Sequence, residues 1–139
     1  MAALHRAVAS LLIFGDELEP SDVTEILGGM PTHSYKRGDD IRRRPDLPER
    51  LALRGHWRRE ANSTEPEDLH AQVLELLHGL TLDLEKWEKL CARFRIIVFC
   101  GWYMHEGNEG VEVAPHTLRL LADRGIGLSL DIYAPDCDA

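Results

Sequence analysis

The most hydrophobic stretch of the chain runs from Phe94 to about His105, and it limits the folds open to this sequence. A glycine-rich acidic loop, "EGNEG", follows it, so the apolar run ends at the surface. No apolar run reaches the roughly 18 residues that span a bilayer. We therefore predict a core strand over residues 95–105, with one side formed by Ile96, Val98, Cys100, Trp102 and Met104.

The same stretch holds a thiol, Cys100, and an imidazole, His105, which raises the question of a reactive pair. A catalytic thiol and its base must come within hydrogen-bond distance. Along a strand, positions five apart face opposite sides and lie about 16 Å from each other. We therefore expect no local dyad, and we predict that Cys100 and Cys91 are both small buried hydrophobes. Trp102, Tyr103 and His105, near the rim of the strand, are better candidates for a function.

Three further strands are predicted. Apolar residues occur at both odd and even positions over His5–Phe14, which indicates a central strand that is covered on both faces. Alternating apolar residues from Ile126 to Ile132 predict a half-exposed strand near the end of the chain. The segment "GHWRRE" is predicted to re-enter the sheet with Trp57 packed inward, and a short strand is expected near His33–Lys36.

Two helices are predicted to begin with proline and to end at glycine. Proline loses no hydrogen bond at the first helical position, and glycine readily ends a helix. Pro20 and Gly28 mark one such helix, and Pro115 and Gly125 mark the other. Hydrophobic staples are predicted at both starts, from Leu18 with Val23 and from Val113 with Leu118.

Leucine-rich stripes at helical spacing occupy residues 69–94. Thr64 and Glu67 have the spacing of a capping box, which predicts a helix start there. Gly79 marks a break in the pattern. Either two helices, over residues 66–79 and 81–93, or one kinked helix fits these stripes.

A chain of 139 residues suits a single domain over residues 1–139. The predicted elements indicate an α+β fold with a mostly antiparallel sheet of four to five strands. Three to four helices are expected to pack largely on one face of this sheet. A long basic loop over residues 36–55 is expected to cover part of the other face, and residues 135–139 are predicted to form a frayed tail.

The formal net charge of −8 is unevenly distributed. Residues 63–139 hold 6 basic and 14 acidic residues and so account for all of it, whereas residues 36–59 hold 9 basic and 4 acidic residues. We interpret the basic segment as a solvated, flexible loop. The overall acidity argues against nucleic acid as the main partner.

The cysteines and the apolar start of the chain bear on its location. Three cysteines lack metal-ligand spacing, and their odd number favours reduced thiols. The segment "AVASLLIFG" runs into acidic residues rather than into a signal-peptide cleavage site. We therefore expect a cytoplasmic protein that does not associate with membranes.

No motif for catalysis or for cofactor binding is present. The chain contains neither a phosphate-binding loop nor a Gly-x-Ser-x-Gly elbow. His70 and His78 are eight residues apart, a spacing that prevents them from sharing a metal ion on one helix. His105 and the glutamates after it are interpreted as a solvated acidic loop. We predict no catalytic residue, no metal and no cofactor.

Several segments occur in one order along the chain: "LEPSDVTEILGGMP", "KRGD", "HW", the leucine-rich helical pair and "VAPHTLRLLADRGIGLSLDIY". Together they resemble the bacterial family called domain of unknown function 4279, over residues 5–134. Ala114 stands where an N-capping serine is more usual, and residues 39–54 are unusually rich in arginine. The resemblance implies a small α+β domain of bacterial origin, and it carries over no catalytic residue.

Three hypotheses on function remain. The acidic surface, the long loop and the lack of catalytic motifs favour a non-enzymatic protein-binding module, such as an immunity-type protein that neutralises a basic toxin-like partner. The alternative is a small-anion-binding protein or an enzyme, with a pocket formed by the arginine-rich loop and the polar sheet face. Association of copies through an edge strand is the third. The candidate contact residues are Arg42, Arg43, Arg44, Arg58, Trp102, Tyr103, His105 and Asp131.

Overall fold

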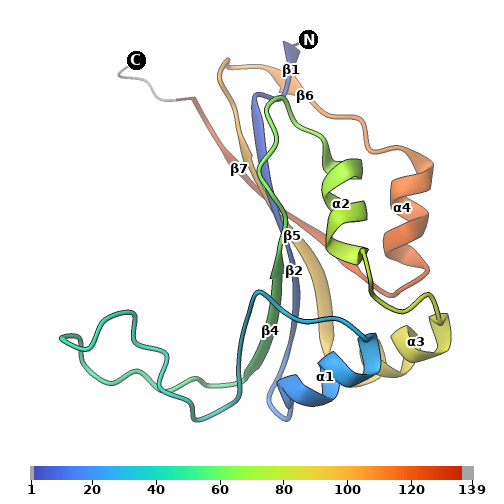
Figure 1. Cartoon of the computed structure of the whole chain (residues 1–139). Coiled ribbons are helices and arrows are strands. Elements are labelled where there is room, and N and C mark those ends of the chain that lie inside the picture. Colours follow the sequence, from blue (N-terminus) through green and yellow to red (C-terminus); the bar gives the residue numbers. More distant parts are fainter. Residues whose placement is uncertain (1, 136–139) are drawn as a thin grey trace.

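Five strands form one sheet, and four helices cover one of its faces (Figure 1). The computed structural model describes residues 2–135. The strands of this sheet are β2 (Arg6–Gly15), β3 (His33–Tyr35), β4 (Gly55–Glu60), β5 (Arg95–Tyr103) and β7 (Gly127–Tyr133). Their order is β3-β4-β2-β5-β7, and only the pair of β5 with β7 is parallel. The α+β fold with a mostly antiparallel sheet is therefore confirmed.

A second, smaller sheet joins the start of the chain to the loop after β5. It consists of β1 (Ala2–Ala3) and β6 (Glu109–Gly110), which pair in parallel.

The four helices all lie on the same side of the sheet in Figure 1. They are α1 (Pro20–Leu27), α2 (Leu69–Leu77), α3 (Leu84–Arg93) and α4 (Pro115–Ala122). Within residues 2–135, none is long and apolar enough to cross a membrane.

The hydrophobic core fills the space between the sheet and the helices. Alternate side chains of the central strands point into it, including Leu11 and Ile13 of β2 and Val98 of β5, all fully buried. Two fully buried tryptophans complete the packing, and both indole N–H groups have partners. Trp57 donates to Thr24 Oγ1 at 3.1 Å, and Trp87 donates to the carbonyl of Thr81 at 2.8 Å.

The helix ends that proline and glycine predicted are confirmed. Pro20 and Pro115 occupy the first turns of α1 and α4. Gly28 and Gly125 follow these helices with φ values of 77° and 70°, a region that favours glycine.

The predicted start of the second helix is wrong. Thr64 instead pairs with Ala7 at the margin of the sheet, through N–H···O bonds of 3.1 and 3.0 Å. The helix begins at Leu69, where the Asp68 side chain accepts the N–H of Ala71 at 3.0 Å. A long-range backbone pairing has displaced a local capping pattern.

The choice between two helices and one kinked helix is resolved in favour of two. Gly79 has a φ of 77°, and the chain re-enters a helix only at Leu84. The Asp83 carboxylate caps that helix by accepting the N–H of Glu85 at 3.0 Å.

Two smaller predictions about burial are wrong. Leu118 is exposed rather than stapled against Val113, and α4 instead buries Thr117 and Leu121. Cys91 is exposed, whereas Cys100 is fully buried as predicted. The predicted frayed tail lies outside the described residues except for Pro135.

Candidate binding surface

The sheet face opposite the helices, here named the open face, has no helix across it within residues 2–135 (Figure 1). It consists of the even positions 6–14 of β2, the odd positions 95–103 of β5, and the residues of β3, β4 and β7 that are in register with them. Leu12 and Phe99 on this face are only partly buried, whereas Leu11 and Val98 on the other face are fully buried. A surface of apolar and aromatic side chains is thus accessible on the open face.

One end of the open face carries a tyrosine cluster, formed by Arg6, Tyr103, Asp131 and Tyr133. The two tyrosine rings stack with centroids 4.7 Å apart, and the Arg6 guanidinium lies 4.2 Å from the Tyr103 centroid. Tyr133 donates its hydroxyl hydrogen to Asp131 Oδ2 at 2.7 Å, and this hydrogen bond raises the pKa of Tyr133.

The other end carries a histidine cluster, formed by Phe14, Tyr35, Arg54 and His56. The His56 ring stacks on Tyr35, with centroids 5.1 Å apart, and more distantly on Phe14. The Arg54 guanidinium lies 4.2 Å from the Phe14 centroid. Partial burial, followed by the neighbouring arginine charges, lowers the pKa of His56. The lowered pKa favours the neutral form of the ring at pH 7.

Between the two clusters, the centre of the open face holds a polar group beside partly buried apolar side chains. Arg58 donates to Ser10 Oγ at 3.3 Å and forms an ion pair with Glu60 at 3.1 Å. Leu12 and Ile97 lie next to each other in the register of β2 and β5. The open face therefore combines a partly apolar centre with arginines and aromatic rings.

Residues 36–54, here named the arm, connect β3 to β4 and extend away from the sheet on the side opposite the helices (Figure 1). The arm does not lie across the sheet, contrary to the prediction from the sequence. Backbone hydrogen bonds join its two limbs, from Ile41 to Arg50 at 2.7 Å and from Ala52 to Asp39 at 2.8 Å. The arm is therefore held together by backbone hydrogen bonds between its own two limbs.

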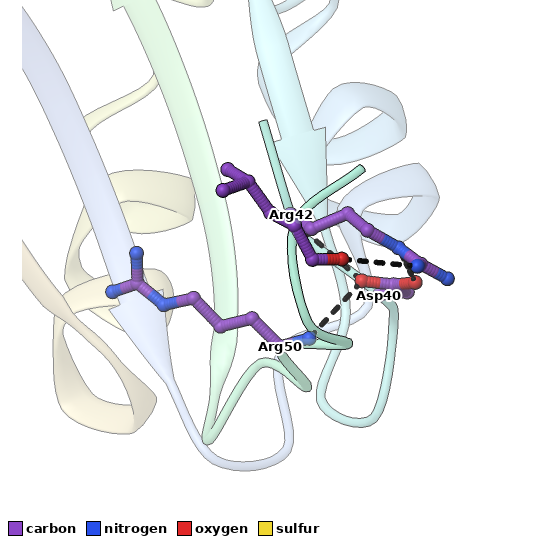
Figure 2. A network of polar contacts seen from close by, with 4 residues as sticks. Asp40, Arg42 and Arg50 are labelled. Atoms are coloured by element: carbon purple, nitrogen blue, oxygen red, sulfur yellow. Dashed lines mark hydrogen bonds and ion pairs between the residues drawn. The ribbon is translucent and has the colours of Figure 1, made fainter. Parts of the chain in front are cut away.

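One carboxylate braces the arm from within (Figure 2). Asp40 Oδ1 accepts the backbone N–H groups of Arg42 at 3.1 Å and Arg50 at 3.3 Å, and its Oδ2 accepts Arg42 Nε at 2.6 Å. The hydrogen bond from the Arg42 backbone is the main reason that the pKa of Asp40 is lowered. Arg42 is thus partly engaged in structure, whereas Arg43 makes no side-chain hydrogen bond or ion pair within the described residues.

A separate cleft lies beyond the end of β5, where His5 and His105 face each other with ring centroids 5.0 Å apart. The Glu109 carboxylate organises this cleft by accepting the backbone N–H groups of His5, His105 and Glu106, each at 3.0 Å. Partial desolvation raises the pKa of Glu109, but these hydrogen bonds outweigh it and lower the pKa overall. Within residues 2–135, no group of three or more His, Cys, Asp or Glu residues is arranged to hold a metal ion.

The candidate contact residues from the sequence lie in five places. Arg42, Arg43 and Arg44 line clefts of the arm, and Arg58 lies at the centre of the open face. Tyr103 and Asp131 meet in the tyrosine cluster. Trp102 is buried under the helices, and His105 lies in the cleft beside His5. The arginines of the arm therefore do not converge with Asp131 or His105 in one pocket.

Cys100 faces the buried side of β5, while His105 lies past the end of that strand. Burial raises the pKa of Cys100 to about 11. The thiolate is scarce at neutral pH, so this side chain is unsuited to nucleophilic chemistry.

Arg6, Tyr35 and His56 were not predicted as contact residues, and Tyr133 was placed on the polar sheet face but not among the candidate contacts. Each belongs to an aromatic cluster whose members come from strands far apart in the chain. The alternation of side chains in the last strand indicated on which face Tyr133 lies. The pairing that places it on Tyr103 depends on the order of the strands in the sheet, which the sequence does not give.

Comparison with known proteins gives one family. The model of the family described as Domain of unknown function (DUF4279) matches residues 4–135. No curated protein and no solved structure matches the chain.

Proposed function

The chain belongs to the DUF4279 family, and we propose that it is a non-enzymatic protein-binding module whose contact surface is the open face. The observation that carries this proposal is the exposed combination of stacked tyrosines, arginines and apolar side chains on a sheet face without a helical cover. Tyrosine and arginine are enriched at the energetic centres of protein interfaces.

The stacked arginines are suited to binding carboxylates. The Arg6 guanidinium lies over the Tyr103 ring, 4.2 Å from its centroid, and carries its N–H donors in a fixed fork. Those donors match the two oxygens of a carboxylate. The rings beneath supply contact area at low entropic cost, because a tyrosine side chain has only two rotatable angles.

The charge distribution indicates an acidic partner for this face. The arm and the open face together hold ten of the sixteen basic residues of the chain but only six of its 24 acidic residues. The rest of the chain therefore holds six basic and eighteen acidic residues. Because opposite potentials steer association, a protein with an acidic surface would approach the open face.

A second candidate function is favoured by the helical side of the molecule. Exposed carboxylates are presented there by α1, α2 and α3, at Asp22, Glu25, Glu75, Glu85 and Glu88. An immunity-type protein that neutralises a basic toxin-like partner would use these groups to steer its association. This candidate places the contact on the opposite side of the molecule, so variants of the two sides separate them.

Affinity capture with two charge-reversal variants tests the proposal. The open-face variant is Arg6→Glu with Arg95→Glu, and the matched control is Lys86→Glu with Lys89→Glu on α3. Both variants change the net charge of the chain by the same amount. We expect that a protein bound by the wild type and by the control is lost from the open-face variant.

Each outcome of this experiment separates the two candidates. If the open-face variant retains every partner of the wild type, the proposed contact surface is wrong. If capture is instead lost when Glu85 and Glu88 are changed to lysine, the immunity-type candidate replaces it.

A further inference from the structure

We propose that two copies of the chain associate through the outer edge of β7, about a two-fold axis at Leu130. The five-stranded sheets of the two copies would then form one continuous sheet, and the inference does not depend on which partner the open face binds.

Within residues 2–135, the backbone groups on the outer edge of β7 have no partner strand. The strand ends the order β3-β4-β2-β5-β7 and pairs with β5 on one side only. The carbonyl of Tyr133 accepts the N–H of Met104 at 3.0 Å, so Tyr133 directs its backbone groups toward β5. Because successive residues alternate in direction, Leu128, Leu130 and Ile132 direct their N–H and C=O groups outward.

Apart from one charged side chain, that of Asp131, this edge lacks the features that normally prevent strands from pairing with other chains. Such features are short length, proline, lysine and β-bulges. β7 has seven residues, contains neither proline nor lysine, and pairs with β5 one residue to one without a bulge. The opposite edge strand, β3, has only three residues and runs into the arm. β7 is therefore the edge that is open to another strand.

The side chains along this edge are exposed and mostly apolar. Leu130 is 40% exposed, Ile132 is 55% exposed and Tyr133 is 43% exposed. Contact with a second strand would remove this apolar surface from water, which is the main favourable term in protein association.

The sequence of β7 is self-complementary when two copies run antiparallel about Leu130. On the helical side, Leu130 would face the Leu130 of the second copy, and Leu128 would face Ile132. On the open face, Ser129 would face Asp131, and Gly127 would face Tyr133. The only charged residue of the strand thus meets a hydroxyl group, and the tyrosine ring meets a glycine that leaves it space.

This register also provides hydrogen-bond partners for the outward N–H and C=O groups of β7. Residues 128, 130 and 132 direct their polar groups outward, and the register pairs 128 with 132 and 130 with itself. Exchange of both bonds at each pair would give roughly six interchain hydrogen bonds. A register centred on Asp131 would place two carboxylates opposite each other. One centred on Ser129 would leave Ile132 and Tyr133 without a partner.

The contact is small, so the association is expected to be reversible. Seven residues extend over about 23 Å of strand. An interface of this extent belongs to the small class that buries less than about 1,200 Å² in total. The fraction of dimer should therefore rise with protein concentration.

Sedimentation velocity of the full chain over a concentration series tests this proposal. The wild type is expected to pass from monomer to dimer within the micromolar to millimolar range. Ser129→Asp places a carboxylate opposite Asp131 twice in each dimer and should weaken association at least about tenfold. Adding Asp131→Lys turns each repulsive pair into an attractive one and should restore the dimer.

Leu53→Lys provides a matched control, because Leu53 is 88% exposed in the arm and distant in sequence from β7. It should leave the association constant unchanged, whereas Leu130→Lys should abolish the dimer. Circular dichroism and the melting temperature establish that each variant is folded. A wild type that stays monomeric up to millimolar concentration overturns the proposal, as does a dimer that Ser129→Asp does not weaken.

Discussion

Two neighbouring leucines on β2 give a direct test of the one-sided helical layer. Leu11 points under the helices and is fully buried, whereas Leu12 points to the open face and is only partly buried. Replacing each by alanine deletes the same atoms from consecutive positions of the same strand. The two variants therefore differ only in the face from which the atoms are removed.

The expected costs follow from burial. Leu11→Ala leaves a cavity that the surrounding core cannot fill, and it should lower the free energy of unfolding by about 3 kcal/mol. Leu12→Ala removes side-chain atoms that are partly in contact with water and leaves a site open to solvent, so its cost should be about 1 kcal/mol. For a domain of this size, these values correspond to reductions in Tm of roughly 12 °C and 4 °C.

Urea unfolding followed by tryptophan fluorescence measures both values. The dependence of the unfolding free energy on urea should be the same for the two variants, so that the midpoints report stability alone. Equal losses for Leu11→Ala and Leu12→Ala would refute the assignment of one covered and one open face.

Two further outcomes are expected. Iodoacetamide labelling of the native protein at about pH 8, read by mass spectrometry, should modify the exposed Cys91 well before Cys100. The reason is that Cys100 is buried and that burial raises its pKa to about 11. Faster labelling of Cys100 would contradict its assigned burial. Burial and nearby arginines lower the pKa of His56 below its ordinary 6.5. The unfolded chain therefore binds a proton at this ring more readily than the folded chain does. The free energy of unfolding should accordingly fall as the pH drops below about 6.5. His56→Gln should reduce that loss in urea unfolding at pH 7.5 and 5.5, and an unchanged pH dependence would argue against it.

The parts of the fold that local chemistry determines were predictable from the sequence. Pro20 and Gly28 bound α1 in the structure because both act through the backbone of their own turn. The capping pattern at Thr64 failed because that residue pairs with Ala7, which lies 57 positions earlier in the chain. No local pattern indicates such a pairing.

The candidate site was less predictable because it depends on strand order. The arginines of the arm and Asp131 were grouped as one anion site, yet the arm adjoins β3 and Asp131 lies on β7, at opposite edges of the sheet. The alternation in the last strand did predict that Leu128, Leu130 and Ile132 share a face. It could not reveal that Leu130 and Ile132 remain exposed, since that depends on how far α4 covers the strand.

The central claim is that the open face is the contact surface, and methyl NMR tests it most directly. Val8, Leu12 and Ile97 report on the open face, whereas Leu74 and Leu82 report on the helical side. The titrant is an oligoglutamate peptide at low salt, which imitates an acidic protein surface. We predict that the methyl signals of Val8, Leu12 and Ile97 shift while those of Leu74 and Leu82 stay unchanged. Shifts confined to the helical side, or no shifts on the open face, would contradict the claim.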